Sequence, residues 1–321
     1  MTVLITGATG LIGRALTQSL VDAGMAVRTV TRRPHRALET FDPRVTAFEW
    51  HPRTEPFPAP ALEGVERIIH LMGEPLYGPL TRENRGRIIA SRRIPTGRLV
   101  EALGRRRVHL IVASSAAVYG GGEGPPLTET TPVQPPKNKM ALALLGCEEE
   151  AERLRDNGSI VTHVRLGAVI APQSFVEPLH GLLARRLIWR KAHPEAAMPA
   201  IDHSDAVALL TWLARSRPMP GAVHAVAPEP LATAALGEVL MGLSPARVRL
   251  ELPRWALRRR VGVLADLLHN RQRIVPQRAL HAGFAFSRPD PMESLRSVLA
   301  QQAHDAAPNE ASLLSAVLQR T

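Results

Sequence analysis

Three glycines near the start of the chain have the spacing of a phosphate-binding loop. In the stretch TGATGLIG, Gly7, Gly10 and Gly13 directly follow a predicted strand and open a predicted helix. The first glycine permits a tight turn, the second lets the backbone approach a pyrophosphate, and the third allows close packing of helix and strand. The N–H groups at the helix start then meet the negative charge of the phosphate. The pattern therefore predicts dinucleotide contacts from Gly7, Thr9, Gly10, Leu11, Ile12 and Gly13.

A pair of arginines stands where a chain that binds NAD would carry an acidic residue. The stretch VTRRP places Arg32 and Arg33 about 20 positions beyond the last glycine, where a carboxylate would hold the ribose hydroxyls of NAD. A guanidinium group can instead bind a 2′-phosphate through two hydrogen bonds. The sequence therefore predicts NADP(H) as the preferred cofactor. The alternative is two solvated arginines in an arginine-rich chain.

Residues that could exchange protons with a substrate lie in the stretch AIDHSDAV, residues 200–207. His203 stands next to Asp202, and histidine is the side chain that titrates near neutral pH. An aspartate directly before a helix more often caps the helix, so capping is the favoured role of Asp202 and acid–base chemistry is the alternative. The cluster is too sparse to predict a metal site. A lone cysteine, Cys147, excludes internal disulfides and multi-cysteine metal sites.

The composition favours a small, anionic partner over a nucleic acid. The chain has 321 residues and a formal net charge of +11, but only 3 of its 40 basic residues are lysines and the arginines are scattered. Aromatic residues, which would stack on bases, make up only 4%. No apolar run approaches the roughly 18 residues of a membrane helix, and the N-terminus passes directly into a strand without a signal sequence. We therefore expect a cytoplasmic protein with neither a nucleic-acid nor a membrane partner.

These residues need a scaffold that brings them to one edge of a sheet. Short β-rich runs alternate with amphipathic stretches in the first half of the chain, which is typical of parallel βαβ units. We expect an α/β fold, with a Rossmann-type doubly wound parallel sheet in 1–171 and a smaller substrate-binding region in 172–321, from which a segment near 200–227 returns to the sheet. Pro95 should kink or divide its helix unless it opens a new one. The predicted strands are 2–6, 26–31, 45–50, 66–72, 108–114 and 160–167, and the predicted helices lie near 11–23, 81–104 and 139–156.

Several motifs resemble the extended short-chain dehydrogenase/reductase superfamily. They are the glycine spacing, SSAAVYG at 114–120 and VRLGAVIAP at 164–172. Further stretches, at 70–76, 80–103, 221–230 and 252–295, are similar to an atypical branch usually called the epimerase family, so that the resemblance spans nearly the whole chain. It implies a fold whose members often form homodimers, with the active site at the carboxyl ends of the strands. It also implies that Leu71, Met72 and Gly73 line the cofactor and that Ser114 and Ser115 face the nicotinamide.

The tyrosine–lysine dyad of catalytic members is missing. In those members the tyrosine exchanges a proton with the substrate, and the lysine one helical turn later lowers the pKa of the tyrosine and binds the nicotinamide ribose. Met140 and Leu144 occupy these two positions here. The resemblance therefore implies either an NADP(H)-dependent reductase or epimerase acting on a small carbonyl or hydroxyl compound, or a non-redox protein. The second class includes an isomerase, a cyclase, a dehydratase and an NADP(H)-sensing protein.

Two residues near the end of the fifth predicted strand are candidates to replace the dyad. Ser115 falls where the superfamily places a serine that binds the substrate carbonyl, although a strand-end serine often only caps backbone. Tyr119 could transfer a proton if a cation lay near it, because an unperturbed phenol has a pKa of about 10. Lys137 and Lys139 are the lysines closest to it in sequence. The alternative for Tyr119 is a structural ring.

The stretch 183–199 is basic where the related branch is glycine-rich. Its cations would suit an acidic or phosphorylated substrate, although a solvated helix face is the favoured interpretation. The four cations of this stretch are Arg185, Arg186, Arg190 and Lys191.

The stretch RWALRRR, at 254–260, predicts a surface helix with Trp255 buried.

Overall fold

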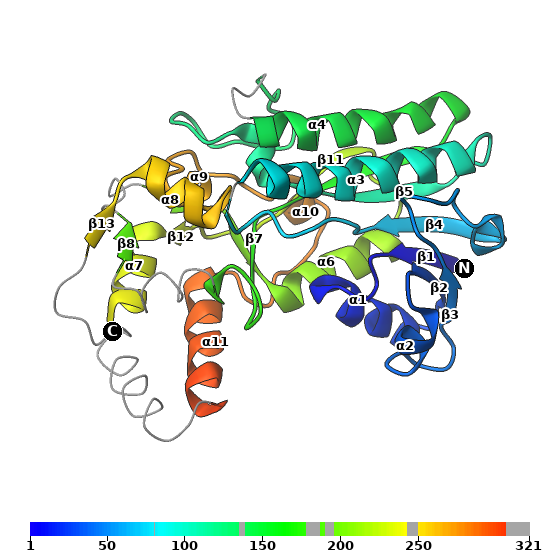
Figure 1. Ribbon diagram of the computed structural model, residues 1–321, viewed down its shortest axis with the longest axis horizontal. Coiled ribbons are helices and arrows are strands. Elements are labelled where there is room, and N and C mark those ends of the chain that lie inside the picture. Colours follow the sequence, from blue (N-terminus) through cyan, green and yellow to red (C-terminus); the bar gives the residue numbers. More distant parts are fainter. Residues whose placement is uncertain (80, 135–138, 178–186, 190–195, 243–249, 306–321) are drawn as a thin grey trace.

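A seven-stranded parallel sheet forms the centre of the computed structural model, which describes residues 1–79, 81–134, 139–177, 187–189, 196–242 and 250–305 (Figure 1). The strand order is β11-β6-β5-β4-β1-β2-β3. This order confirms the predicted Rossmann-type α/β fold. The strands are β1 Thr2–Thr6, β2 Ala26–Thr31, β3 Thr46–Glu49, β4 Val65–His70, β5 His109–Ser115, β6 Ile160–Leu166 and β11 Gly221–Ala225.

Helices cover both faces of the sheet (Figure 1). On one face, Leu16 of α1 and Leu210 of α6 join an apolar cluster with the strand residues Val3 and Ile5. On the other face, α3 and α4 pack together, and Leu99 of α3 joins a second cluster that includes further strand residues. The strands are buried because apolar side chains cover both of their faces, as expected for a parallel sheet. The helices are α1 Leu11–Asp22, α2 Pro34–Leu38, α3 Arg82–Leu103, α4 Lys139–Glu152 and α6 His203–Arg215.

The C-terminal part of the chain both returns to the sheet and builds a smaller layer beside it. β11 pairs with β6 in parallel, with Val223 opposite Val164. The smaller layer has its own apolar cluster, in which Leu257, Leu264 and Leu295 from three different helices meet. Its strands pair as β7 Ala168–Ile170 with β10 Ala200–Asp202, β9 Ala197–Met198 with β12 Leu231–Ala232, and β8 Leu187–Trp189 with β13 Leu250–Leu252. Its helices are α7 Thr233–Gly242, α8 Arg254–Val261, α9 Leu264–Leu268, α10 Gln277–His281 and α11 Pro291–Asp305.

Two local predictions differ from the structure. α3 runs without interruption from Arg82 to Leu103, so Pro95 does not divide its helix, while a kink at Pro95 stays a prediction. Trp255 is 68% exposed rather than buried. The reason is that α8 turns Leu257 and Val261 towards the apolar cluster, while Trp255 lies on another side of this short helix.

Other predictions fall outside the described residues. They concern Lys137, Arg185, Arg186, Arg190 and Lys191. Among the helices that the structure does describe, none combines the length and the apolar character needed to cross a lipid bilayer.

Candidate functional site

The glycine loop joins β1 to α1 and leaves no space for side chains at two of its glycines. Gly7 has a φ of +75°, and a Cβ atom there would lie 2.9 Å from the carbonyl carbon of Leu71. A Cβ atom on Gly13 would lie only 2.2 Å from the carbonyl oxygen of Gly7, so this glycine allows α1 to pack directly on the loop. Helix α1 begins after Gly10 without a side-chain cap. Its first N–H groups are therefore available to an anion.

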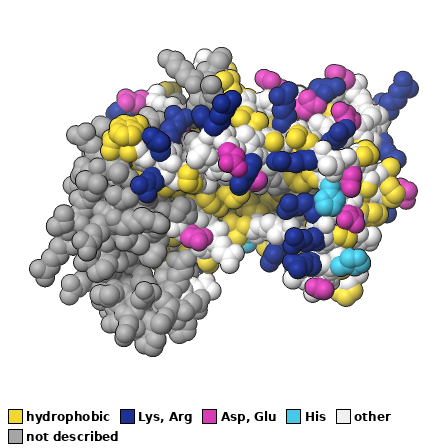
Figure 2. Space-filling view, in the orientation of Figure 1, with side chains coloured by type: hydrophobic (Ala, Val, Ile, Leu, Met, Phe, Trp, Pro, Cys, Tyr) yellow, Lys and Arg dark blue, Asp and Glu magenta, His cyan; other side chains and the backbone are white. Residues whose placement is uncertain are grey.

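A groove of about 340 Å³ opens at the carboxyl ends of the central strands. Figure 2 shows apolar side chains in the middle of this face of the molecule, bordered by Lys and Arg side chains. The groove is formed by loops that follow β1, β4, β5 and β6, because the carboxyl ends of neighbouring parallel strands meet at one edge of a sheet. Its lining includes Gly7, Gly10, Leu11, Ile12, Gly13, residues 71–77, 113–115 and 166–169, and Leu144 of α4.

The structure brings most of the predicted cofactor residues to this groove. The lining contains all three glycines, the residues 71–73, and both serines at the end of β5. Thr9 lies beside it, and its carbonyl oxygen accepts a hydrogen bond from Nε of Arg14 at 3.0 Å. Arg32 and Arg33 are exposed in the loop after β2, the strand next to β1. They lie beyond the groove lining, on the side where a bound dinucleotide would extend past β2.

The two positions of the missing dyad are apolar in three dimensions as well. Leu144 is buried and lines the groove. Met140 is buried beside Ile88 and Val118 and is not part of the groove lining. α4 thus presents a hydrocarbon surface where a phenol and an ammonium group would be expected.

The serines at the end of β5 have different partners. Ser114 Oγ donates a hydrogen bond of 2.6 Å to Oε1 of Glu148. Ser115 Oγ accepts one of 3.2 Å from the backbone N–H of Ala117 and thereby caps the 3-10 helix η2 Ala116–Tyr119. The hydroxyl hydrogen of Ser115 has no acceptor among the residues that the structure describes. Ser115 can therefore donate this hydrogen to an oxygen atom in the groove.

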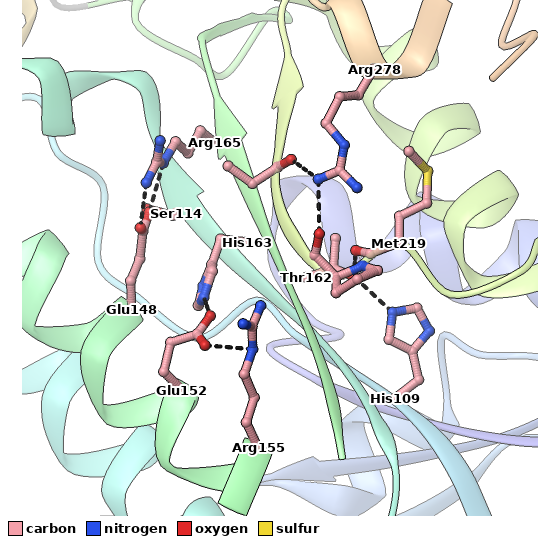
Figure 3. Close-up of polar contacts among 12 residues, drawn as sticks. His109, Ser114, Glu148, Glu152, Arg155, Thr162, His163, Arg165, Met219 and Arg278 are labelled. Carbon is pink, nitrogen blue, oxygen red and sulfur yellow. Dashed lines mark hydrogen bonds and ion pairs between the residues drawn. The ribbon is translucent and has the colours of Figure 1, made fainter. Parts of the chain in front are cut away.

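Glu148 and Arg165 form a buried ion pair behind the groove (Figure 3). Nη2 of Arg165 lies 2.7 Å from Oε2 of Glu148, and Nε lies 3.0 Å from Oε1. Burial alone would raise the pKa of Glu148, but the hydrogen bonds and positive charge of Arg165 outweigh it and hold this pKa below its ordinary value. The carboxylate therefore stays charged at neutral pH and keeps Ser114 oriented.

Tyr119 belongs to this buried network rather than to the groove. Nη1 of Arg165 donates to its phenol oxygen at 2.7 Å, and the phenol lies 2.8 Å from Nε2 of His224. Since Nδ1 of His224 is bonded to the carbonyl of Val275, it carries the ring hydrogen, and Nε2 accepts a hydrogen bond from the phenol hydroxyl. Burial raises the pKa of Tyr119 despite the nearby arginine. The cation beside Tyr119 is thus Arg165 of β6, and Tyr119 has the contacts of a structural ring.

The three polar residues at the start of α6 have hydrogen-bond partners in three different parts of the structure. Asp202 caps the helix, because its Oδ1 accepts a hydrogen bond from the N–H of Ser204 at 2.7 Å. His203 donates from Nε2 to the carbonyl oxygen of Leu11 at 3.0 Å, which ties α6 to the start of α1. Asp205 accepts from the backbone N–H groups of Ser287 and Arg288, both at 2.9 Å. Asp202 and His203 do not line the groove, and these contacts support the favoured role of Asp202 as a helix cap.

Sequence reasoning missed the polar groove residues Glu74, Tyr77 and Arg92, of which Glu74 forms an ion pair with Arg87. The phenol of Tyr77 has no hydrogen-bond partner within the described residues, and burial raises its pKa, so it stays protonated at neutral pH. Arg92 extends from α3, and its guanidinium makes one hydrogen bond within the described residues, from Nη1 to the carbonyl of Ile88 at 3.3 Å. Arg92 lies in the stretch 80–103 that carries the family resemblance, and Tyr77 directly follows the stretch 70–76, but no local pattern marks either residue as functional.

A buried histidine near the groove cannot act as a base. His70, at the end of β4, lies between two threonines, with Nδ1 2.7 Å from Oγ1 of Thr6 and Nε2 3.1 Å from Oγ1 of Thr96. Thr96 donates its own hydrogen to the carbonyl of Arg92 and so accepts from His70, which leaves Nδ1 to accept from Thr6. Burial lowers the pKa of His70 to about 4. Both ring nitrogens are therefore occupied, and the ring is neutral.

Comparisons with known proteins agree with this fold. The model of the NAD dependent epimerase/dehydratase family matches residues 3–198. The epimerase family protein SDR39U1 homolog of Arabidopsis thaliana is 26% identical over 93% of this chain and 87% of its own length. The crystal structure of human epimerase family protein SDR39U1 with NADPH has a TM-score of 0.73 at 22% identity, covering 93% of this chain and 99% of the human one. A Bacillus cereus UDP-glucuronic acid 4-epimerase, in complex with UDP-glucuronic acid and NAD, has a TM-score of 0.72 at 16% identity, covering 94% and 100% of the two chains.

Proposed function

Because the chain belongs to the NAD dependent epimerase/dehydratase family, we propose that it binds NADP(H) in the groove and acts as a reductase or epimerase on a small carbonyl or hydroxyl compound. The glycine cradle is the observation that carries the cofactor part of this proposal. Gly13 brings the uncapped start of α1 against the loop, and Gly10, which also lines the groove, has no side chain to keep a pyrophosphate away. Backbone N–H groups and the helix dipole then favour the negative charge.

Arg32 and Arg33 support NADP(H) over NAD(H). Both are exposed at the end of β2, and nearby acidic side chains do not form ion pairs with them in the described structure. A guanidinium group there can pair with a 2′-phosphate, which NAD(H) lacks. The NADPH in the human relative's structure is consistent with this preference.

Arg32→Ala should therefore weaken NADPH binding by about 1 to 3 kcal/mol, as expected for the loss of a charge-assisted contact. NADH binding should stay the same, because NADH has no group for this arginine. Calorimetric titration with both nucleotides measures the difference. Arg105→Ala is the matched control, since this exposed arginine precedes β5 and lies near the amino ends of the strands, opposite the groove. Equal losses for NADPH and NADH would contradict the assignment.

The groove holds the groups that a carbonyl reduction needs from the protein. When bound, the nicotinamide supplies or accepts a hydride. The hydroxyl hydrogen of Ser115 can bind the substrate oxygen and orient it. Tyr77, whose phenol stays protonated, can deliver a proton to that oxygen in the direction of reduction. Leu144 and other apolar lining residues exclude water from the reacting atoms.

The two tyrosines of the chain allow a direct test of the proton donor. Tyr77→Phe should lower the rate of NADPH oxidation with a carbonyl substrate by about 100-fold, the lower end of the usual general-acid contribution, while NADPH affinity stays unchanged. Tyr119→Phe removes a phenol hydroxyl from the buried network instead, and this substitution should leave the rate of NADPH oxidation nearly unaltered. Stopped-flow absorbance of NADPH, over a panel of small aldehydes, ketones and keto acids, measures both. A large loss of rate in Tyr119→Phe with little loss in Tyr77→Phe would instead identify Tyr119 as the proton donor.

A non-redox function is the second candidate, and the apolar surface of α4 favours it. With Met140 and Leu144 at the dyad positions, the protein could bind NADP(H) and catalyse an isomerisation, cyclisation or dehydration, or only sense the nucleotide. Tight binding of NADPH without oxidation by any member of the carbonyl panel would favour this function.

A further inference from the structure

Among the residues that the structure describes, no carboxylate forms an ion pair with Arg92, a cation that lines the groove. Of its five N–H donors, one is bonded to the carbonyl of Ile88, and no other hydrogen bond of this guanidinium occurs within the described structure. The nearby carboxylate of Glu74 is already paired with Arg87 at 3.0 Å. Most donors of Arg92 therefore lack a protein acceptor in the described part of the chain, although the side chain is partly buried at the groove.

The backbone beside Arg92 is shaped to hold the guanidinium at the groove wall. A Cβ atom on Gly73 would lie 2.7 Å from Cζ of Arg92 and 3.0 Å from its Nε. Gly73 does not have the left-handed conformation that would require glycine for its backbone angles, so the space that it leaves is used by Arg92. Burial lowers the pKa of Arg92 to about 10, which still leaves the side chain charged at neutral pH.

Arg92 shares its surroundings with the position of the missing lysine. Arg92 and Leu144 both line the groove, and both also line a second, smaller cavity together with Ser114. The guanidinium from α3 thus reaches the part of the groove where α4 offers only hydrocarbon. α3 and α4 pack against each other along the same face of the sheet, which brings the two side chains together.

We propose that Arg92 donates hydrogen bonds to the hydroxyl oxygens of the nicotinamide ribose, an inference that rests on the NADP(H) site proposed above. In superfamily members with the dyad, the lysine binds this ribose. Here Leu144 cannot, and Arg92 supplies the cation from the neighbouring helix. The planar guanidinium presents parallel donors, which suit two adjacent hydroxyl groups better than a single ammonium does.

Arg92→Met tests the assignment with two nucleotide probes. NADPH contains the nicotinamide ribose, whereas 2′,5′-ADP contains only the adenosine half and its 2′-phosphate. The variant should bind NADPH about 10- to 100-fold more weakly, the range for losing hydrogen bonds from a charged group, and should bind 2′,5′-ADP as the wild type does. Arg92→Lys should recover part of the NADPH affinity. Calorimetry measures both nucleotides, and unchanged 2′,5′-ADP binding shows that the variant is folded.

Gly73→Ala gives an independent variant that leaves Arg92 in the sequence. Its methyl group should push the guanidinium aside and weaken NADPH binding several-fold. In an Arg92→Met background the same methyl group should have little effect, since Cζ is no longer there. A similar loss in both backgrounds would show that the methyl group contacts the nucleotide directly and would count against the proposal.

The remaining outcomes separate this inference from the cofactor proposal. If the wild-type protein binds NADPH and Arg92→Met binds it equally well, the ribose contact is wrong while the cofactor site stands. A change only in the KM of the substrate would likewise overturn the ribose contact and assign Arg92 to the substrate. Equal weakening of NADPH and 2′,5′-ADP would reduce Arg92 to a structural role. If the wild-type protein binds neither nucleotide, the proposed function itself fails.

Discussion

Arg165→Met is expected to lower the free energy of unfolding by about 3 to 5 kcal/mol, because it leaves a buried carboxylate without its counter-ion. The side chains of Arg165 and Glu148 are only 9% and 8% exposed, and two hydrogen bonds join them. In the variant, the hydroxyl of Ser114 would be the one side-chain hydrogen-bond donor left to Glu148 among the described residues. Tyr119 would lose the guanidinium as well, so that the whole network behind the groove would be affected.

Urea denaturation at neutral pH measures this loss, with Arg87→Met as the matched control. Arg87 pairs with Glu74 at a similar distance, but the two side chains are 54% and 36% exposed, and such pairs contribute about 0 to 1 kcal/mol. The difference between Arg165→Met and wild type should also shrink as the pH falls below 4.5, the ordinary pKa of Glu148, because the pair is lost when this carboxylate is protonated. Equal losses in both variants would contradict the importance of the buried pair.

Gly13→Ala is expected to weaken NADPH binding by at least about 10-fold and to destabilise the fold by about 1 to 3 kcal/mol, the usual cost of overpacking. The added methyl group would meet the carbonyl oxygen of Gly7 at 2.2 Å and the Cα atom of Ala8 at 2.7 Å. Both are backbone atoms and cannot rotate away. The start of α1 must therefore move away from the loop, and its N–H groups no longer point at the position of the phosphate.

Gly146→Ala is the control for this substitution and should act in the opposite direction. Gly146 lies in α4, and a Cβ atom there would meet nothing within 4 Å. Alanine should therefore stabilise the helix by about 0.5 to 1 kcal/mol and leave NADPH affinity unchanged. Thermal denaturation and calorimetric titration of both variants test the pair. NADPH binding by Gly13→Ala at wild-type affinity would show that the loop does not hold the pyrophosphate.

The fold and the glycine loop could be predicted because their determinants are local in sequence. The apolar run of β1, the spacing of Gly7, Gly10 and Gly13, and the helix that follows lie within about 20 residues of one another, as the motif requires. The alternation of strands and helices likewise fixes a parallel sheet, and a parallel sheet brings its loops to one edge. The groove lining after β4 and β5 followed from family resemblance, since no local chemistry marks it.

The remaining features depend on contacts between distant residues. Tyr119 was expected to need a nearby cation for proton transfer, and only lysines close in sequence were considered. The cation beside it is Arg165, which the pairing of β6 with β5 brings there. Arg92 is one arginine among many in this chain, and only its packing over Gly73 distinguishes it. The adjacent residues Asp202 and His203 looked like one polar unit, but the first turn of α6 sends them to different partners.

Titration of the unaltered protein with NADPH and with NADH, side by side, tests the central claim most directly. We expect one NADPH to bind per chain, with NADH weaker by about 10-fold or more because it lacks the 2′-phosphate contact. Failure of both nucleotides to bind, or equal affinity for the two, would contradict the account of the glycine loop and of the arginine pair, respectively.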